Sequence, residues 1–328
     1  FSANGINNTY RTILRVPKDL GEENFVIASP SKRTTENNFD VYEFSQDQLL
    51  GNYVWVQRGR KQIYKFKLTQ NLRKTEETKT GNINEYRMVI PTGNDSVKIT
   101  QDVYYTNISP EPNYLESDGN GNIIGVFKFP SNLDNTIVIE GYAIVETKKD
   151  FDINLTGTLG DIDKNKFKID LSPAQYWESD NSQIISRANQ IKGTSTSIGK
   201  IMSDTYNFIT DSIDYSNVKR FGLNIRQGAL KTLNGGAAVC MEYSDLYIAL
   251  LRAQGIPARA AFGYGYDNKA PSDKQELHQW AQVYVPTYQK WVDVDVTWGD
   301  NGPAIIGGDL NHFLTHTASL SPNDPSTL

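Results

Sequence analysis

The chain has 328 residues and a net charge of −5 at pH 7, with acidic and basic residues mixed along it. This balance argues against a nucleic-acid groove and against an anchor on an anionic membrane. Hydrophobic residues make up 38% of the sequence, enough for a full core. No apolar run approaches the roughly 18 residues of a membrane span. With a single cysteine, the chain has no internal disulfide.

Residues 1 to about 150 have the composition of short β-strands with partial alternation. The strand-like runs are 9–16, 52–56, 62–68, 86–90, 97–100, 123–129 and 136–142. Short strands at close spacing with few helix signals predict an all-β sandwich region. A weak repeat of proline-containing patterns predicts two β units, 1–75 and 76–150, and one large sandwich is the alternative. The polar segment 151–168 is expected to be a linker.

Two sequence features partly match metal-binding patterns. The run Asp118–Asn122 resembles the start of a calcium loop, but Ile123 and Phe129 stand where the loop needs Gly and Glu, so a hairpin turn is favoured. His312 and His316 are four apart, as metal ligands on a helix are, but no Glu or Cys completes a set. We therefore expect no metal and no cofactor, with a role at the rim of a site kept open for His312.

The cysteine lies at the start of a predicted helix. Residues 182–191 and 198–213 are also expected to be helical, and both come before it. Cys240 follows the glycine-rich run 235–239 and opens a run with apolar residues at helical spacing, which Gly255 and Pro257 end. The first turn of a helix has free N–H groups that stabilise an anion. Cys240 is therefore a candidate nucleophile, and the same N–H groups can hold an oxyanion.

A histidine and two aspartates follow on alternating, strand-like sequence. His278 shares one face of the run 278–285 with Trp280, and Asp293 shares one face of the run 291–297 with Asp295. A hairpin with its turn at 286–290 brings an imidazole and a carboxylate together on neighbouring strands. Such a carboxylate orients the ring and stabilises the imidazolium formed when the thiol loses its proton. The periodicity does not choose between Asp293 and Asp295.

These motifs together resemble the transglutaminase-like superfamily. Its nucleophile helix is similar to the run from Gly235-Gly236 through Cys240 to Ala249-Leu250-Leu251-Arg252, and its other motifs are similar to His278-x-Trp280-x-x-Val283 and Trp291-Val292-x-Val294-Asp295. The resemblance covers residues from about 176 to 316. It implies an α+β papain-like domain at 169–328 and a triad of Cys240, His278 and Asp295. Val296 departs from many relatives, which carry proline after that aspartate.

The resemblance implies acyl transfer from protein or peptide carboxamides through a thioester on Cys240. An amine then resolves the thioester, as in crosslinking. One alternative is a peptidase or amidase in which water is the acceptor, and another is a non-catalytic surface binding protein. Aromatic residues near the motifs, among them Trp280, Trp291 and Trp298, are expected either to line a substrate channel or to belong to the core.

The resemblance and the start of the chain also indicate a location. The sequence begins at Phe1 without an initiator methionine, which is typical of a chain that starts after a removed signal or anchor. Transglutaminase-like domains with N-terminal β domains occur in many secreted bacterial proteins. We therefore expect an extracellular or cell-surface protein.

Overall fold

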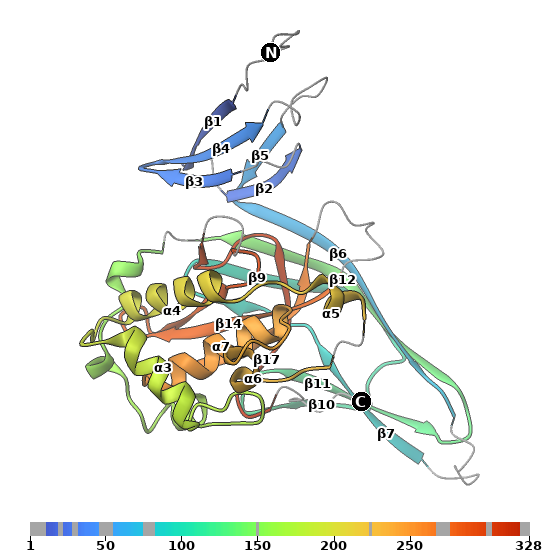
Figure 1. Ribbon diagram of the computed structural model, residues 1–328. Coiled ribbons are helices and arrows are strands. Elements are labelled where there is room, and N and C mark those ends of the chain that lie inside the picture. The colour runs from blue at the N-terminus through green and yellow to red at the C-terminus, as the bar shows by residue number, and fades with distance from the viewer. Residues whose placement is uncertain are drawn as a thin grey trace.

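Figure 1 shows the computed structural model of the chain. The structure describes residues 11–18, 22–27, 32–45, 55–74, 83–148, 151–222, 225–266, 276–299 and 304–321. No helix among these residues has the length and apolar character needed to cross a membrane.

Two small antiparallel sheets come first, at the N-terminal end in Figure 1. One has the order β1-β4-β3 and the other pairs β2 with β5. Their bounds are β1 Arg11–Pro17, β2 Glu22–Ile27, β3 Lys32–Glu36, β4 Phe39–Ser45 and β5 Trp55–Gly59. β1 and β5 overlap the strands predicted at 9–16 and 52–56. β2, β3 and β4 were not predicted.

The next two sheets pack face to face. One has the order β6-β12-β9-β8 and the other β10-β11-β7. Their bounds are β6 Lys61–Leu72, β7 Ile83–Ile90, β8 Asn94–Asp95, β9 Ile99–Ser109, β10 Tyr114–Ser117, β11 Ile123–Pro130 and β12 Asn135–Thr147. Phe66, Phe127, Ile137 and Ile139 fill the space between the sheets. This sandwich confirms the predicted strand-rich region.

A tight turn joins β10 to β11. One carboxylate oxygen of Asp118 accepts hydrogen bonds from the backbone N–H groups of Asn120 and Asn122, both at 2.9 Å. Asp118 thus closes the turn on itself, as short polar side chains do in place of a backbone partner. The predicted hairpin turn is confirmed.

Strand pairing bears on where the β region divides. β6 pairs with β12 from Lys61↔Glu146 to Leu72↔Asn135, so a single sheet joins strands on both sides of residue 75. In the expected linker, Ile162 and Phe167 are buried in the core of the helical half. The division into 1–75, 76–150, 151–168 and 169–328 stays a prediction, and the pairing favours a boundary before β6.

The C-terminal half combines helices with a five-stranded antiparallel sheet of order β16-β15-β14-β13-β17. The helices are η2 Ile153–Leu155, η3 Leu159–Asp161, α2 Lys168–Leu171, α3 Ser182–Lys192, α4 Ile198–Ser212, α5 Asn217–Phe221, α6 Ala229–Leu233 and α7 Cys240–Ala253. The strands are β13 Ala258–Gly265, β14 Leu277–Val285, β15 Lys290–Asp295, β16 Ile305–Ile306 and β17 His312–Ala318. The helices predicted at 182–191 and 198–213 are confirmed.

Helix α7 is the centre of this half, packed against β13 and β14 on one side and against α3, α4 and α6 on others (Figure 1). Every residue from Glu242 to Arg252 is buried. The helix ends just before Gly255, which has a φ of 87°, a left-handed conformation that glycine adopts at little cost. The N–H of Ile256 then donates a hydrogen bond to the carbonyl of Leu251 at 2.9 Å. This fixed helix sets the position of Cys240 at its other end.

The edge strand β17 is held by the β-sandwich. The side-chain amide of Gln101 donates to the Leu314 carbonyl and its oxygen accepts from the Leu314 N–H, both at 2.8 Å. Asn122 makes the same pair of bonds with Thr317, at 2.8 and 2.9 Å. These amides satisfy backbone groups that a sheet edge leaves free. β17 also corrects the helical spacing suggested for His312 and His316, because both lie on a strand.

Candidate active site

Cys240 is the first residue of α7 and is partly exposed. The residue before it, Val239, has an extended backbone, and its N–H donates to a carboxylate oxygen of Glu242 at 3.1 Å. Glu242 thereby caps the N-terminus of the helix by accepting from the residue before it, while the backbone N–H groups of the first turn have no partner within the helix. The nucleophile predicted from sequence lies where an anion is stabilised.

A buried ion pair between Lys219 and Glu242 braces the start of this helix. Lys219 of α5 places its ammonium 2.6 Å from Glu242, and their side chains are 7% and 0% exposed. The backbone N–H of Gln227 donates to the same carboxylate at 3.1 Å. Glu242 therefore ties α5 and the loop before α6 to the first turn of α7. A Lys 21 residues upstream of Cys240 on a short helix gives no sequence signal for this contact.

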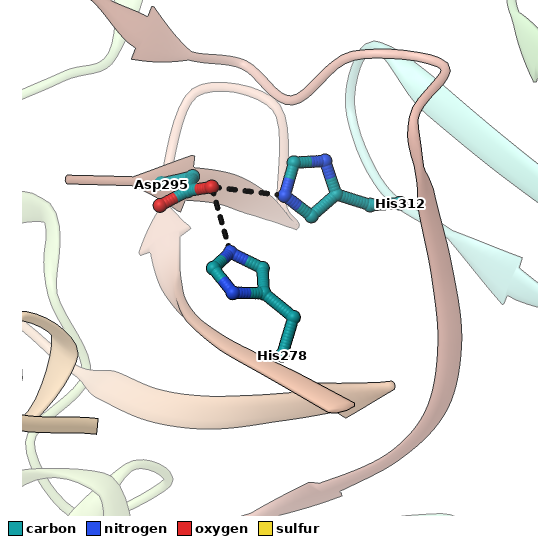
Figure 2. A group of neighbouring side chains, drawn as sticks. All are labelled: His278, Asp295 and His312. Carbon is teal, nitrogen blue, oxygen red and sulfur yellow. Dashed lines mark hydrogen bonds and ion pairs between the residues drawn. The ribbon is translucent and has the colours of Figure 1, made fainter. Parts of the chain in front are cut away.

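His278 and Asp295 meet across the β14–β15 hairpin, as Figure 2 shows. The His278 Nε2 lies 2.9 Å from Asp295 Oδ2. The other carboxylate oxygen accepts from the backbone N–H of Thr297 at 2.8 Å and of Trp298 at 3.2 Å. Asp295 is thus fixed by the turn that follows its strand, and His278 Nδ1 is the ring nitrogen left for the thiol.

The charges of the site support one another. Burial opposes the charged ring, but Asp295 and then Cys240, which is hydrogen-bonded to the ring, raise the pKa of His278 to about 9. Burial also opposes the Asp295 carboxylate, yet His278 and His312 hold its pKa well below its ordinary value. At neutral pH the imidazolium of His278 and the carboxylate of Asp295 therefore coexist beside the Cys240 sulfur.

The strand periodicity allows either Asp293 or Asp295 to be the partner of His278, and in the structure the two carboxylates have different partners. Asp293 accepts from Trp280 Nε1 and from Gln282 Nε2, both at 2.9 Å. It shares the strand face with Asp295, as predicted, but its carboxylate is used to hold two side chains of β14. Asp295 is the aspartate that contacts His278.

His312 is a further member of the cluster (Figure 2). Its Nε2 lies 3.0 Å from Asp295 Oδ2 and its Nδ1 lies 2.7 Å from Asp309 Oδ1. Among the described residues, His278, Asp295 and His312 bring three ligand-type atoms within 4.8 Å of one another, a grouping that can hold a metal ion. Hydrogen bonds account for the same closeness, because one carboxylate oxygen accepts from both rings. The absence of a metal site stays a prediction.

The aromatic residues divide between the site and the core. Trp298 stacks on His278, with 4.9 Å between ring centroids and 25° between planes. Trp280 is buried and lies edge-on to His312. Trp291 packs against the main core and under the guanidinium of Arg259. Of these tryptophans, Trp298 and Trp280 border the cluster, whereas Trp291 is a core residue.

Comparisons with known proteins bear on the same segment. Residues 185–296 match the model of the transglutaminase-like superfamily. This segment is a transglutaminase-like domain. It contains Cys240, His278 and Asp295, and it ends before Asp309 and His312. No curated protein matches the sequence.

Two solved structures are similar to this chain. A candidate cysteine protease from Cytophaga hutchinsonii has a TM-score of 0.54 at 18% identity, over 81% of this chain and 83% of that one. The periplasmic domain of TgpA from Pseudomonas aeruginosa has a TM-score of 0.34 at 14% identity, over 73% of this chain and 87% of that one. The first likeness shows a shared fold: a strand-rich N-terminal region followed by the mixed α/β transglutaminase-like domain.

Proposed function

We propose that the protein is a cysteine acyltransferase that acts on carboxamides of proteins or peptides, with Cys240, His278 and Asp295 as its triad. One observation carries the proposal. The imidazole of His278 is hydrogen-bonded to Cys240 and lies 2.9 Å from the buried carboxylate of Asp295. The transglutaminase-like domain supports cysteine chemistry at this site.

In this mechanism the Cys240 sulfur attacks the carboxamide carbon and forms a tetrahedral intermediate. The N–H of Cys240 donates to its oxyanion at the start of α7. His278 then gives a proton to the leaving amine as the C–N bond breaks and a thioester remains. An incoming amine gives its proton to His278 while it attacks the thioester, which restores the thiolate and the imidazolium.

For the second oxyanion donor we propose the phenol of Tyr215. The backbone of Tyr215 bridges to Ala238, two residues before Cys240, and its ring lies 6.3 Å from that of Tyr243. Burial, and next the charge of Cys240, raises the pKa of Tyr215. The phenol therefore keeps its proton at neutral pH, and its O–H group can donate a hydrogen bond to an oxyanion.

Mass spectrometry of a glutamine-containing protein, incubated with the enzyme and a primary amine, tests the proposal. Amine incorporation that disappears in Cys240→Ala supports the acyltransferase. Cleavage or deamidation that depends on Cys240, without incorporation, identifies water as the acceptor and replaces the proposal with the peptidase or amidase alternative. No change with a broad set of substrates favours a surface binding protein.

A further inference from the structure

Four side chains form a continuous row of hydrogen bonds that reaches beyond the triad. In order they are Asp309, His312, Asp295 and His278, joined at 2.7, 3.0 and 2.9 Å. The side chains of His312, Asp295 and His278 are at most 7% exposed, and that of Asp309 is 17% exposed. Negative and positive groups alternate along this row, so each charge has an opposite neighbour.

The geometry sets the protonation of His312. Both of its ring nitrogens face carboxylate oxygens, and a carboxylate accepts but does not donate. A neutral ring has one N–H, so only the imidazolium donates to both. Burial opposes this charge, but Asp309 and Asp295 outweigh it and raise the pKa of His312 to about 10. His312 is therefore a cation at neutral pH.

The surroundings hold the His312 ring in place. The rings of Trp280 and Trp298 lie 4.8 and 5.0 Å from it. Asp309, its partner, accepts in turn from the backbone N–H of Asn311 at 2.8 Å. Two residues along β17, the backbone of Leu314 is clasped by Gln101 of the β-sandwich. The ring is thus a fixed part of the site.

We propose that His312 is a positioning residue for the triad. Its ring is held between Asp309 and Asp295, where it fixes the orientation of the Asp295 carboxylate. The negative charge of Asp295 is thereby shared between two cations, His312 and His278. This inference rests on the proposed function, since it assigns a role to a residue behind the same triad. His312 and Asp309 lie outside the segment that matches the superfamily.

The His312 cation affects the pKa of His278 in a definite direction. Asp295 attracts protons to His278, and the cation of His312 offsets part of that attraction. The ionisable groups around His312 are Asp309 ahead of β17, Asp295 and Asp293 on β15, His278 on β14 and Tyr64 on β6, with Cys240 of α7 beyond His278. Without the His312 cation, His278 faces uncompensated carboxylates, so its pKa rises.

His316 provides a matched control on the same strand. Its ring stacks on Phe262, with 4.7 Å between centroids, and its Nδ1 lies 3.0 Å from the hydroxyl of Thr315. No carboxylate of the described residues is paired with it. His312→Gln removes the clamp, whereas His316→Gln makes the same chemical change away from the triad.

Nuclear magnetic resonance of the imidazole nitrogens tests the inference without an activity assay, because the chain has only three histidines. We expect the His312 ring to stay doubly protonated through pH 8. In His312→Gln we expect the pKa of His278 to rise by about one unit or more, and in His316→Gln to stay unchanged. In Asp309→Asn, which keeps the ring, the pKa of His312 falls.

The enzyme assay gives a second readout. In His312→Gln we expect the alkaline limb of the pH profile of kcat/KM to move to higher pH, together with the pKa of His278. We also expect kcat to fall about 10- to 100-fold, because the Asp295 carboxylate is no longer held in its orientation. A loss of kcat with no shift of the limb indicates structural support alone and overturns the proposal. If His312→Gln does not fold, Asp309→Asn carries the test.

Three other results overturn the inference. One is a His312 that titrates near the ordinary histidine pKa of about 6.5. The second is an unchanged His278 in the His312→Gln variant. The third is a stoichiometric metal in the purified protein whose removal by chelator shifts the signals of both rings, which assigns the cluster to a metal. Failure of the proposed function appears separately, as a wild-type chain with no Cys240-dependent activity.

Discussion

At the scale of single residues, Asp295 and Asp293 show how much a β-strand pattern determines. Alternation placed both carboxylates on the face that carries His278, and this was confirmed. Which carboxylate meets the imidazole depends on the stagger between two strands and on the turn after β15, which donates two N–H groups to Asp295. Only the resemblance to a family selected Asp295 from the sequence.

We predict that Asp295→Asn lowers kcat by about 10²- to 10⁴-fold, because an amide keeps the shape but not the charge that stabilises the imidazolium. Asp293→Asn is the matched change two residues away, and it should cost far less. Steady-state kinetics of amine incorporation or hydrolysis in the two variants checks this. Equal losses would contradict the assignment.

Tyr215 supports a second prediction at this scale. Tyr215→Phe removes only the hydroxyl, so kcat should fall by about 10- to 10³-fold with little change in KM, as for loss of one oxyanion donor. Tyr142→Phe, at an exposed tyrosine of the sandwich, is the control and should behave like the wild type. An unaltered kcat in Tyr215→Phe would remove this residue from the oxyanion site.

His316 yields a prediction about pH and stability. Burial lowers the pKa of His316 to about 4, whereas the unfolded chain has the ordinary value of about 6.5. Between these values the unfolded state binds the proton and the folded state does not, so stability falls as pH falls from 6.5 toward 4. His316→Gln should flatten this part of the Tm profile. Parallel profiles for variant and wild type would show that His316 does not titrate as the structure indicates.

At the scale of elements, β17 is the strand that the sequence pattern indicates least clearly. The run from His312 to Ala318 has β-branched and aromatic residues, a strand signal that the four-residue histidine spacing obscured. No local pattern shows that this strand joins β13, or that Asp309 and His312 reach Asp295. In contrast, α3, α4 and α7 were predicted to within one or two residues, since their periodicity is local.

Gln101 connects the β-sandwich to this strand. Gln101→Ala leaves the buried N–H and carbonyl of Leu314 without partners, which should cost about 2–4 kcal/mol of stability. Because His312 lies two residues away on β17, kcat should fall as well. Gln70→Ala, at an exposed position on β6, is the matched control and should change neither. Thermal unfolding and kinetics of both variants distinguish them, and a Gln101→Ala protein as stable as Gln70→Ala would contradict the bracing role.

At the scale of the whole molecule, the fold brings pieces distant in sequence to one site. The proposed nucleophile comes from the start of a buried helix, the histidine and aspartate of the proposed triad come from a hairpin, and the proposed clamp comes from an edge strand that the sandwich supports (Figure 1). Composition and periodicity were sufficient to predict the all-β region and the helices and hairpin that follow it, whereas the α+β domain was implied by the resemblance to a family. Contacts between the two were not predictable, because they depend on which edges and faces meet.

The central claim is that Cys240 is activated by His278 and Asp295, and the rate of its alkylation tests this most directly. The single cysteine makes the mass of the adduct unambiguous. Iodoacetamide should modify Cys240 faster than free cysteine between pH 5 and 8, and His278→Gln should abolish this advantage. A Cys240 that reacts no faster than free cysteine over this range, with or without His278, would contradict the claim.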